Sequence, residues 1–272
     1  MAETTAPRIA VIGTGRMGET LIRVLIRAGV VAPERITATA HRPRRLASLA
    51  TELGIQVAED NHQAVQGADL VLLCVKPQSA DTVLAELSPT LGAQQLLVSI
   101  LAGVSTPYIE QRLERPVPVV RAMPNTPSLL SEGMTALCRG HAATEEQLER
   151  VRQLFEHLGR TVVLDEKYFD AVTGLSGSGP AFIYMVIEAL AEGGVKVGLP
   201  RHIATELAAQ TCLGGARMVI ETGHHPAVLK DAVTTPAGCT VDGLLQLEEG
   251  GLRVTLIKAV VEATRRAREL VS

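Results

Sequence analysis

The stretch that decides the fold is residues 8–18, Arg8-Ile9-Ala10-Val11-Ile12-Gly13-Thr14-Gly15-Arg16-Met17-Gly18. An apolar run of strand length leads directly into a G-x-G-x-x-G turn, and helical spacing continues from Glu19 to Ala28. In this context Gly13 permits a tight turn, Gly15 lets a pyrophosphate approach the backbone, and Gly18 lets helix and strand pack closely. A plain glycine turn is the alternative, but the strand–turn–helix order predicts dinucleotide binding.

The next predicted strand, residues 36–40, bears on the kind of dinucleotide. Folds that take NAD often carry an acidic residue at the end of this strand, where it binds the ribose 2′-hydroxyl. Here the strand runs into His41-Arg42-Pro43-Arg44-Arg45, with three arginines and no carboxylate. Because a guanidinium pairs well with phosphate, the segment favours NADPH, with NADH as an open alternative. We prefer Arg42, which lies nearest the strand end. A solvated basic helix start is the other reading.

The order of elements predicts an α/β protein. Up to residue 167, short apolar strands alternate with helices, which is typical of a mostly parallel sheet covered on both faces. From residue 181 only helical periodicity is found, and the predicted helices are 181–197, 200–222, 226–231, 241–249 and 252–270. We therefore expect a Rossmann dinucleotide-binding domain over residues 1–167, followed by an all-helical dimerisation domain over residues 168–272. Small residues such as Ala208, Ala209, Gly214, Gly215 and Ala216 permit close helix packing within one subunit or between two.

Composition excludes several classes of protein. A net charge of −3, no tryptophan and 2% aromatic residues argue against a nucleic-acid binder. Four cysteines without C-x-x-C spacing are typical of reduced intracellular thiols, and we expect a cytoplasmic protein. The N-terminus lacks the pattern of a secretory signal, and no uninterrupted apolar run is long enough to cross a membrane. His224 and His225 have no third ligand spaced to join them, so we expect a surface turn and no metal.

Loops after the strands supply further candidates, because ligands of open α/β sheets bind beyond the carboxyl ends of the strands. Lys76 follows a clear buried strand and lies either near the dinucleotide or at an exposed turn. Asn61 opens a short helix, where it either caps the helix or reaches the adenosine ribose. Asn125 stands between Pro124 and Pro127, where its amide suits a nicotinamide carboxamide or an Asx turn.

A second informative stretch is residues 231–243, Asp-Ala-Val-Thr-Thr-Pro-Ala-Gly-Cys-Thr-Val-Asp-Gly. Small, hydroxyl-bearing and turn-forming residues precede an apolar helical run there. We expect Thr240 at the N-cap of the helix, with Pro236 stiffening the approach and Gly238 letting a ligand come close. A helix start of this kind suits a carboxylate, and a threonine-rich cap without a ligand is the alternative.

Five segments, 13–18, 75–77, 123–127, 170–180 and 230–248, together resemble the pyrroline-5-carboxylate reductase family, in family order over nearly the whole chain. The resemblance implies reduction of 1-pyrroline-5-carboxylate to L-proline by NAD(P)H, the last step of proline biosynthesis. It also implies a Rossmann domain, a helical dimerisation domain and a site shared between two subunits. Homodimers of this family often assemble into decamers of five dimers.

Matching by position assigns roles to individual residues. Thr240 would be the catalytic hydrogen-bond donor at the ring nitrogen, with water as the proton source. The substrate carboxylate would be held by Thr235 and by the backbone of Gly238, Cys239 and Thr240, and Glu166 matches an acidic substrate-side position. Ala232 stands where some relatives carry a cofactor-binding Asn, so only a main-chain contact is expected there. The expected cofactor-binding residues, from motifs and resemblance together, are Ile12, Gly13, Thr14, Gly15, Arg16, Met17, His41, Arg42, Asn61, Cys74, Val75, Lys76, Pro77, Ala102 and Asn125.

Other functions stay open from the sequence. A reductase of the same architecture would act on a different cyclic imine, and a non-catalytic regulator would bind NADPH without oxidising it. A serine hydrolase is disfavoured, because Ser176 and Ser178 lack both the G-x-S-x-G spacing and a preceding strand.

Overall fold

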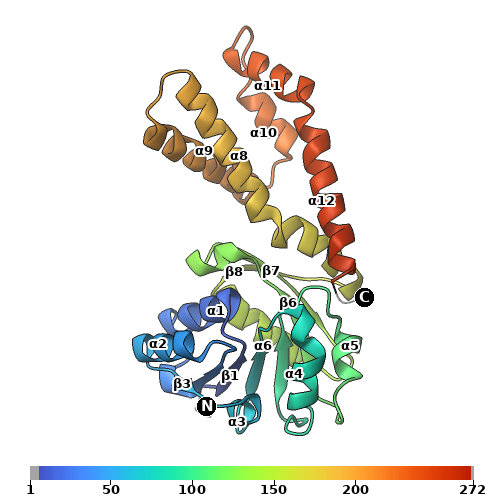
Figure 1. Cartoon of the computed structure of the whole chain (residues 1–272). Helices are drawn as coiled ribbons and strands as arrows, with labels where there is room; N and C mark the ends of the chain where they lie inside the picture. Colours follow the sequence, from blue (N-terminus) through green and yellow to red (C-terminus); the bar gives the residue numbers. More distant parts are fainter. Residues whose placement is uncertain (1–5, 271–272) are drawn as a thin grey trace. The chain divides into compact units, whose positions relative to one another are not determined.

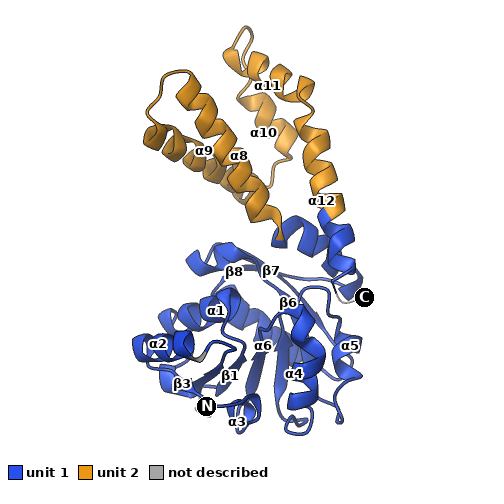
Figure 2. Ribbon diagram, in the orientation of Figure 1, with its two compact units in different colours: residues 1–177, 263–272 blue, residues 178–262 orange. Residues whose placement is uncertain are grey.

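The computed structural model describes residues 6–270, and the chain forms two compact units (Figures 1 and 2). Unit 1 comprises the chain up to Gly177 together with the segment that begins at Ala263. Unit 2 is Ser178–Glu262. The domain boundary after residue 167 stays a prediction, because packing within one chain does not show which part folds on its own.

Unit 1 is built on one eight-stranded sheet in the order β3-β2-β1-β4-β5-β6-β7-β8. Neighbouring strands are parallel except for the antiparallel pair β6 and β7, so the expected mostly parallel sheet is confirmed. Strands β2 and β3 lie on one side of β1, and the chain then crosses over to place β4 on its other side. The topological switch point is therefore between β1 and β4. The strands are β1 (Ile9–Ile12), β2 (Ile36–Thr39), β3 (Gln56–Val57), β4 (Leu70–Leu73), β5 (Leu96–Ser99), β6 (Val119–Met123), β7 (Gly133–Arg139) and β8 (Gly159–Val163).

Helices cover both faces of this sheet. Ile9 and Val11 pack into the core shared with α1, α2 and α6, whereas Ala10 and Ile12 pack into the core shared with α3, α4 and α5. This alternation is the period of two that a strand imposes on its side chains. The helices are α1 (Arg16–Arg27), α2 (Pro43–Leu53), α3 (Asn61–Val65), α4 (Ala80–Leu87), α5 (Thr106–Glu110) and α6 (Glu145–Glu156).

Local sequence explains several helix ends. The Thr144 hydroxyl accepts a hydrogen bond from the Gln147 amide, and the Gln147 side chain accepts one from the Thr144 amide, which closes a capping box at the start of α6. Helix α2 stops at Gly54, whose φ of +76° is left-handed.

Two short helical turns and a short helix connect β8 with the boundary of unit 1 at Gly177. They are the 3₁₀ turn η4 (Glu166–Tyr168), the helix α7 (Phe169–Val172) and the π-helical turn η5 (Thr173–Gly177).

Unit 2 contains helices and no strand within residues 178–262, which confirms the all-helical C-terminal half. Helices α8 and α9 pack through small residues, since a Cβ on Gly194 would lie 3.0 Å from the Ala204 Cβ. The buried core of the unit consists of Ala191, Ala204 and Ala208, while large apolar side chains such as Val197 are exposed. The helices are α8 (Gly179–Lys196), α9 (Arg201–Thr222), α10 (Pro226–Ala232), α11 (Cys239–Glu249) and α12 (Leu252–Arg268), which continues into unit 1.

Candidate active site

The turn between β1 and α1 leaves room for a phosphate. Gly13 has φ +93°, and a Cβ there would lie 2.7 Å from Val75 Cγ1. A Cβ on Gly18 would lie 2.5 Å from the Gly13 carbonyl oxygen, whereas a Cβ on Gly15 would meet no atom within 4 Å. Gly13 and Gly18 are therefore required for packing, and Gly15 opens space in front of a helix start that has no side-chain cap. This arrangement fits a dinucleotide pyrophosphate.

The carboxyl end of β2 holds this turn in place. The Thr39 carbonyl oxygen accepts hydrogen bonds from the Thr14 amide at 2.9 Å, the Thr14 hydroxyl at 2.8 Å and the Gly13 amide at 3.2 Å. From the neighbouring strand end, the Cys74 amide donates to the Ile12 carbonyl at 2.8 Å. Hydrogen bonds from two strands thus fix the backbone that faces the cofactor space.

Asn61 is oriented by two side chains. Its Oδ1 accepts a hydrogen bond from Thr39 Oγ1 at 2.7 Å, and its Nδ2 donates to Glu86 Oε2 at 2.6 Å. Asn61 is not the cap of α3, because Asp60 is the N-cap and accepts from the Gln63 amide. Of the two readings of Asn61, the structure excludes the N-cap.

The three arginines after β2 lie in different surroundings. Glu19 accepts hydrogen bonds from Arg45 Nη2 at 2.6 Å and from Arg23 Nε at 2.9 Å. Partial burial acts to raise the pKa of Glu19, but hydrogen bonds from Arg45 and Arg23 lower it overall. Arg42 is the N-cap residue of α2, and the side chains of His41 and Arg42 are exposed. Arg45 is therefore engaged within the protein, whereas Arg42 faces solvent.

The loops after β4 and β5 lie at the carboxyl ends of these strands, the edge of the sheet where the cofactor is expected, which we call the cofactor edge. Lys76 is exposed and precedes the 3₁₀ turn η2 (Pro77–Ser79). Burial raises the pKa of the Cys74 thiol far above its usual range, which makes this cysteine a neutral packing residue at physiological pH. Ala102 is half-buried in the loop after β5.

Asn125 joins three segments of unit 1. It precedes the 3₁₀ turn η3 (Thr126–Leu130), and its Oδ1 accepts a hydrogen bond from the Met134 amide at 2.9 Å. Its Nδ2 donates to the Ser176 carbonyl at 3.2 Å and lies 3.3 Å from the Ser176 hydroxyl. The amide is thus used within the protein, and its contact with a nicotinamide stays a prediction.

The candidate substrate residues of unit 2 surround the start of α11. The Gly238 amide donates to the Thr235 carbonyl at 3.0 Å, which closes a turn over Pro236 and Ala237. A Cβ on Gly238 would overlap Thr235 Oγ1, so a larger residue there would have to displace the Thr235 side chain. Ala237 has φ +57°, a left-handed conformation that is costly for alanine.

The expected N-cap at Thr240 is wrong. Helix α11 begins at Cys239, its N-cap is Gly238 with extended backbone, and Thr240 is the second helical residue. The physical reason is the turn that ends at Gly238, which brings the helix start forward by two residues. Because glycine has no side-chain acceptor, the first N–H groups of α11 have no side-chain cap, and such a helix start suits an external carboxylate.

Glu166 lies in unit 1, on η4. Its Oε1 accepts hydrogen bonds from the Thr106 amide at 2.7 Å and from Arg121 Nη1 at 3.0 Å, and its Oε2 accepts from the Thr106 hydroxyl at 2.7 Å. Sequence reasoning missed both partners. The signal for Arg121 was a charged residue inside an otherwise apolar run of strand length, and Thr106 gave none.

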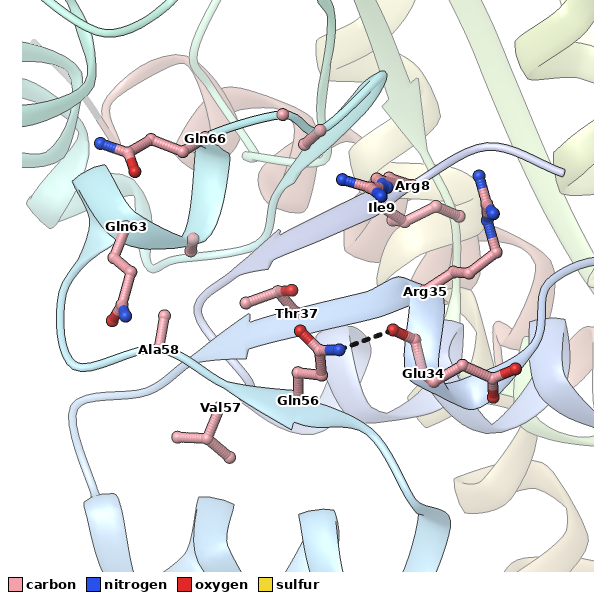
Figure 3. Close-up of a pocket in the computed structure, with 13 residues that line it drawn as sticks. Arg8, Ile9, Glu34, Arg35, Thr37, Gln56, Val57, Ala58, Gln63 and Gln66 are labelled. Carbon is pink, nitrogen blue, oxygen red and sulfur yellow. Dashed lines mark hydrogen bonds between the residues drawn. The ribbon is translucent and has the colours of Figure 1, made fainter. Parts of the chain in front are cut away.

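Unit 1 has two cavities. The first contains none of the candidate site residues, and the second contains only Glu166. A polar cavity of about 450 Å³, lined by Arg8 and Arg35 among others, lies where β1 and β2 begin (Figure 3). Gly15 follows the other end of β1. In this cavity Gln56 Nε2 donates to the Glu34 carbonyl at 3.0 Å. A second cavity, of about 520 Å³, is lined by the ends of β7 and β8, the residues that follow them and the start of α6, Glu166 included. Within residues 6–270, no group of three or more His, Cys, Asp or Glu side chains is arranged for a metal ion.

These features define a class, the nucleotide-dependent oxidoreductases that join a Rossmann domain to a helical dimerisation domain. The family model for pyrroline-5-carboxylate reductase dimerisation matches residues 166–270, and the model for NADP oxidoreductase, coenzyme F420-dependent, matches residues 8–103. The chain belongs to the pyrroline-5-carboxylate reductase family, as its resemblance implied.

Similar proteins cover nearly the whole chain. The chain is 44% identical to the pyrroline-5-carboxylate reductase of Glycine max, over 95% of this chain and 94% of the relative. It is also 44% identical to that of Methanosarcina acetivorans, over 97% of each. The solved reductase of Coxiella burnetii superposes with a TM-score of 0.89 at 36% identity, covering 98% of this chain and 100% of the other. The Plasmodium falciparum enzyme, solved with NADP bound, gives 0.87 at 28% identity and 98% coverage of each.

Proposed function

We propose that this protein reduces 1-pyrroline-5-carboxylate to L-proline, with NADPH as the preferred hydride donor. The observation that carries the proposal is that each unit, in a chain of this family, contains a helix start without a side-chain cap that suits an anion. One, behind Gly15, has the open space a pyrophosphate needs, and the other, behind Gly238, suits the carboxylate of a small substrate. NADH remains the alternative donor.

Residues of unit 1 would hold the cofactor. The backbone of Gly15 and Arg16, at the start of α1, would bind the pyrophosphate. Arg42 would pair with the 2′-phosphate, and Asn61 would reach the adenosine ribose from its fixed position beside Thr39. When bound, the cofactor supplies the hydride that reduces the C=N bond.

Residues of unit 2 would hold the substrate. The amides of Cys239 and Thr240 would bind its carboxylate, together with the Thr235 hydroxyl. The Thr240 hydroxyl would donate a hydrogen bond to the ring nitrogen, which must gain a proton as the imine carbon gains hydride. Water would supply that proton. Catalysis would then rest mainly on positioning and electrostatics.

We further propose that unit 2 forms a homodimer, with assembly into a decamer of five dimers as the family expectation. Its large apolar side chains are exposed in one chain, for example Met185 at 73% and Val197 at 81%. Gly214 and Gly215 meet nothing within 4 Å, so the close approach they permit is left for another subunit. The helical run Glu166–Lys196 is apolar and long enough to span a membrane, but an uncovered dimer face gives the same signal. We propose a cytoplasmic location.

The test of the reaction is NADPH oxidation with DL-1-pyrroline-5-carboxylate, with L-proline measured as the product. Rapid oxidation with stoichiometric proline supports the proposal. Faster oxidation with another cyclic imine, not inhibited by L-proline, would move the assignment to a different imine reductase. Tight NADPH binding without oxidation of any imine would instead favour a regulator. Light scattering of the same sample tests the dimer, which a stable monomer would contradict.

A further inference from the structure

The loop between β5 and α5 has a two-residue tip, Ala102–Gly103, with a buried residue on each side. Leu101 and Val104 are 1% and 0% exposed, while Ala102 and Gly103 between them are half-buried. The Ile100 amide donates to the carbonyl of Leu73 at 3.1 Å, which ties the start of the loop to β4. The position of the tip therefore depends on how firmly the far end of the loop is held.

A carboxylate sixty residues further along the chain holds that far end. Thr106, the first residue of α5, is 3% exposed and donates to Glu166 through both its amide and its hydroxyl, each at 2.7 Å. These two bonds use both carboxylate oxygens. The loop is consequently closed by a contact from η4 that no local sequence supplies.

Arg121 fixes the carboxylate in turn. Its guanidinium donates to Glu166 Oε1 at 3.0 Å and lies over the buried Phe169 ring, 4.7 Å from the centroid. The side chain is 4% exposed, and its Nε and Nη2 are buried without a partner. Glu166 is thus the anion that balances a buried positive charge, and its own position is set by the sheet.

The cluster lies level with the cofactor edge of the sheet. Arg121 is the register partner of Ser99, the last residue of β5, which in turn is level with Leu73 and, through it, Ile12. Strands β4, β5 and β6 lie on the far side of the switch point from β2, which leads to Arg42, the proposed partner of the 2′-phosphate. In a doubly wound sheet this half holds the nicotinamide end of a dinucleotide.

We propose that Glu166 and Thr106 are positioning residues for hydride transfer, which hold the Ala102–Gly103 tip against the nicotinamide half of the bound cofactor. The inference rests on the proposed function, because it takes the ligand to be NAD(P)H. Neither residue touches the cofactor in this account. A shift of the loop would leave the adenosine half in place and misplace the reacting carbon, where small displacements are costly.

The test uses Thr106→Val, because it removes the hydroxyl donor and leaves the Glu166–Arg121 pair intact. Thr106→Ser keeps the donor, and Thr135→Val is the matched control, since Thr135 is a 1% exposed threonine on β7. Thr135 shares its face of the strand with Leu137, opposite Cys138 and Phe169. Turnover and the Kd values of NADPH and of 2′,5′-ADP, which fills only the adenosine half, are measured for each.

We expect Thr106→Val to lower kcat about tenfold or more and to weaken NADPH, while 2′,5′-ADP binds within about twofold of wild type. Thr106→Ser should restore most of kcat. Equal behaviour of Thr106→Val and Thr135→Val would overturn the proposal, as would an equal loss for NADPH and 2′,5′-ADP. A rise in the KM of the imine alone would instead make Glu166 a substrate contact.

The two binding measurements separate this inference from the proposed function. If the wild type binds NADPH but reduces no 1-pyrroline-5-carboxylate, the proposed reaction fails, and the NADPH and 2′,5′-ADP comparison still tests the loop. Glu166→Gln is a second variant, which leaves the buried Arg121 charge unpaired. We expect it to lower the Tm as well as kcat, whereas an unchanged Tm and kcat would contradict the role given to the carboxylate.

Discussion

Glu19 Oε2 accepts a hydrogen bond from Arg45 Nη2 at 2.6 Å, and this contact distinguishes Arg45 from Arg42. Arg23 also binds Glu19 but is paired with Glu52 as well, so two arginines face two carboxylates and the charge of Arg45 is balanced within the α1–α2 layer. Arg42, at the N-cap of α2, is exposed. The preference for Arg42 as the 2′-phosphate partner, first made from its place in the sequence, thereby gains a structural reason.

Replacing Arg42 should change cofactor preference. We expect Arg42→Ala to raise the KM for NADPH about tenfold or more, since a hydrogen bond to a charged group contributes about 1.5–3 kcal/mol, and to leave the KM for NADH unchanged. Arg45→Ala is the matched control and should alter neither. Steady-state kinetics with both cofactors make the comparison. Equal losses for NADPH and NADH in Arg42→Ala would rule out a 2′-phosphate contact.

Two of the motif glycines, Gly13 and Gly15, should separate stability from binding. Gly15→Ala should leave the Tm unchanged, because its Cβ meets no protein atom, and should weaken NADPH binding by filling the space in front of α1. Gly13→Ala should instead destabilise the fold, since φ +93° and the contact with Val75 both exclude a side chain. Calorimetry and NADPH titration distinguish the two effects. Unchanged NADPH affinity in a folded Gly15→Ala variant would place the pyrophosphate elsewhere.

Thr240 should matter for turnover more than for cofactor binding. We expect Thr240→Ala to lower kcat by about 10²-fold, as when one preorganised hydrogen-bond donor at a reacting atom is lost, with the Kd of NADPH nearly unchanged. Thr240→Ser should recover most of the activity. Thr234→Ala is the neighbouring control, because Thr234 follows the end of α10 and its hydroxyl donates to the Lys230 carbonyl of that helix. A Thr240→Ala enzyme with wild-type turnover would remove Thr240 from the mechanism.

Ala237 offers a test of backbone strain near the substrate residues. Its φ of +57° is disfavoured for alanine by about 1–2 kcal/mol, part of which glycine loses again to its freer unfolded chain. Ala237→Gly should therefore stabilise the protein by about 0.5–1 kcal/mol, measured by denaturant unfolding. Val233→Gly, in a right-handed conformation with φ −97°, should not stabilise it. A loss of stability in Ala237→Gly would show that this turn is not strained.

Cys138 should stay a thiol up to high pH. Burial first, and then the neighbouring Glu166, raise its pKa to about 12. The folded protein therefore keeps a proton that the unfolded chain loses near pH 8.5, so this contribution to stability is full below that pH and declines as pH rises toward 12. Iodoacetamide at pH 9 should spare Cys138 in the native protein and modify it after unfolding, as peptide mass spectrometry would show. Labelling of native Cys138 at pH 9 would contradict its burial.

Local patterns predicted much of this molecule. The strand–turn–helix order around Gly13, the strand after Ala68 and the helices of unit 2 follow from periodicity and from glycine and proline punctuation. Helix α3 begins at Asn61, the residue expected to open it. These features depend on residues that are close together in the sequence, so one sequence is enough to predict them.

Long-range contacts were beyond that reasoning. The partners of Glu166 lie 45 and 60 residues away, at Arg121 and Thr106, and only the tertiary fold brings them together. The N-cap of α11 was misplaced at Thr240 because a hydrogen bond between Gly238 and Thr235, invisible in the residue types, sets where the helix begins. The contacts of the substrate and cofactor residues with their ligands stay predictions.

The most direct test of the central claim follows the hydride itself. The protein is incubated with 1-pyrroline-5-carboxylate and NADPH that carries deuterium at both positions of nicotinamide C4, and the proline formed is analysed by mass spectrometry. The account predicts L-proline with a single deuterium, on the ring carbon that belonged to the C=N bond. Unlabelled proline, or no proline despite NADPH binding, would contradict it.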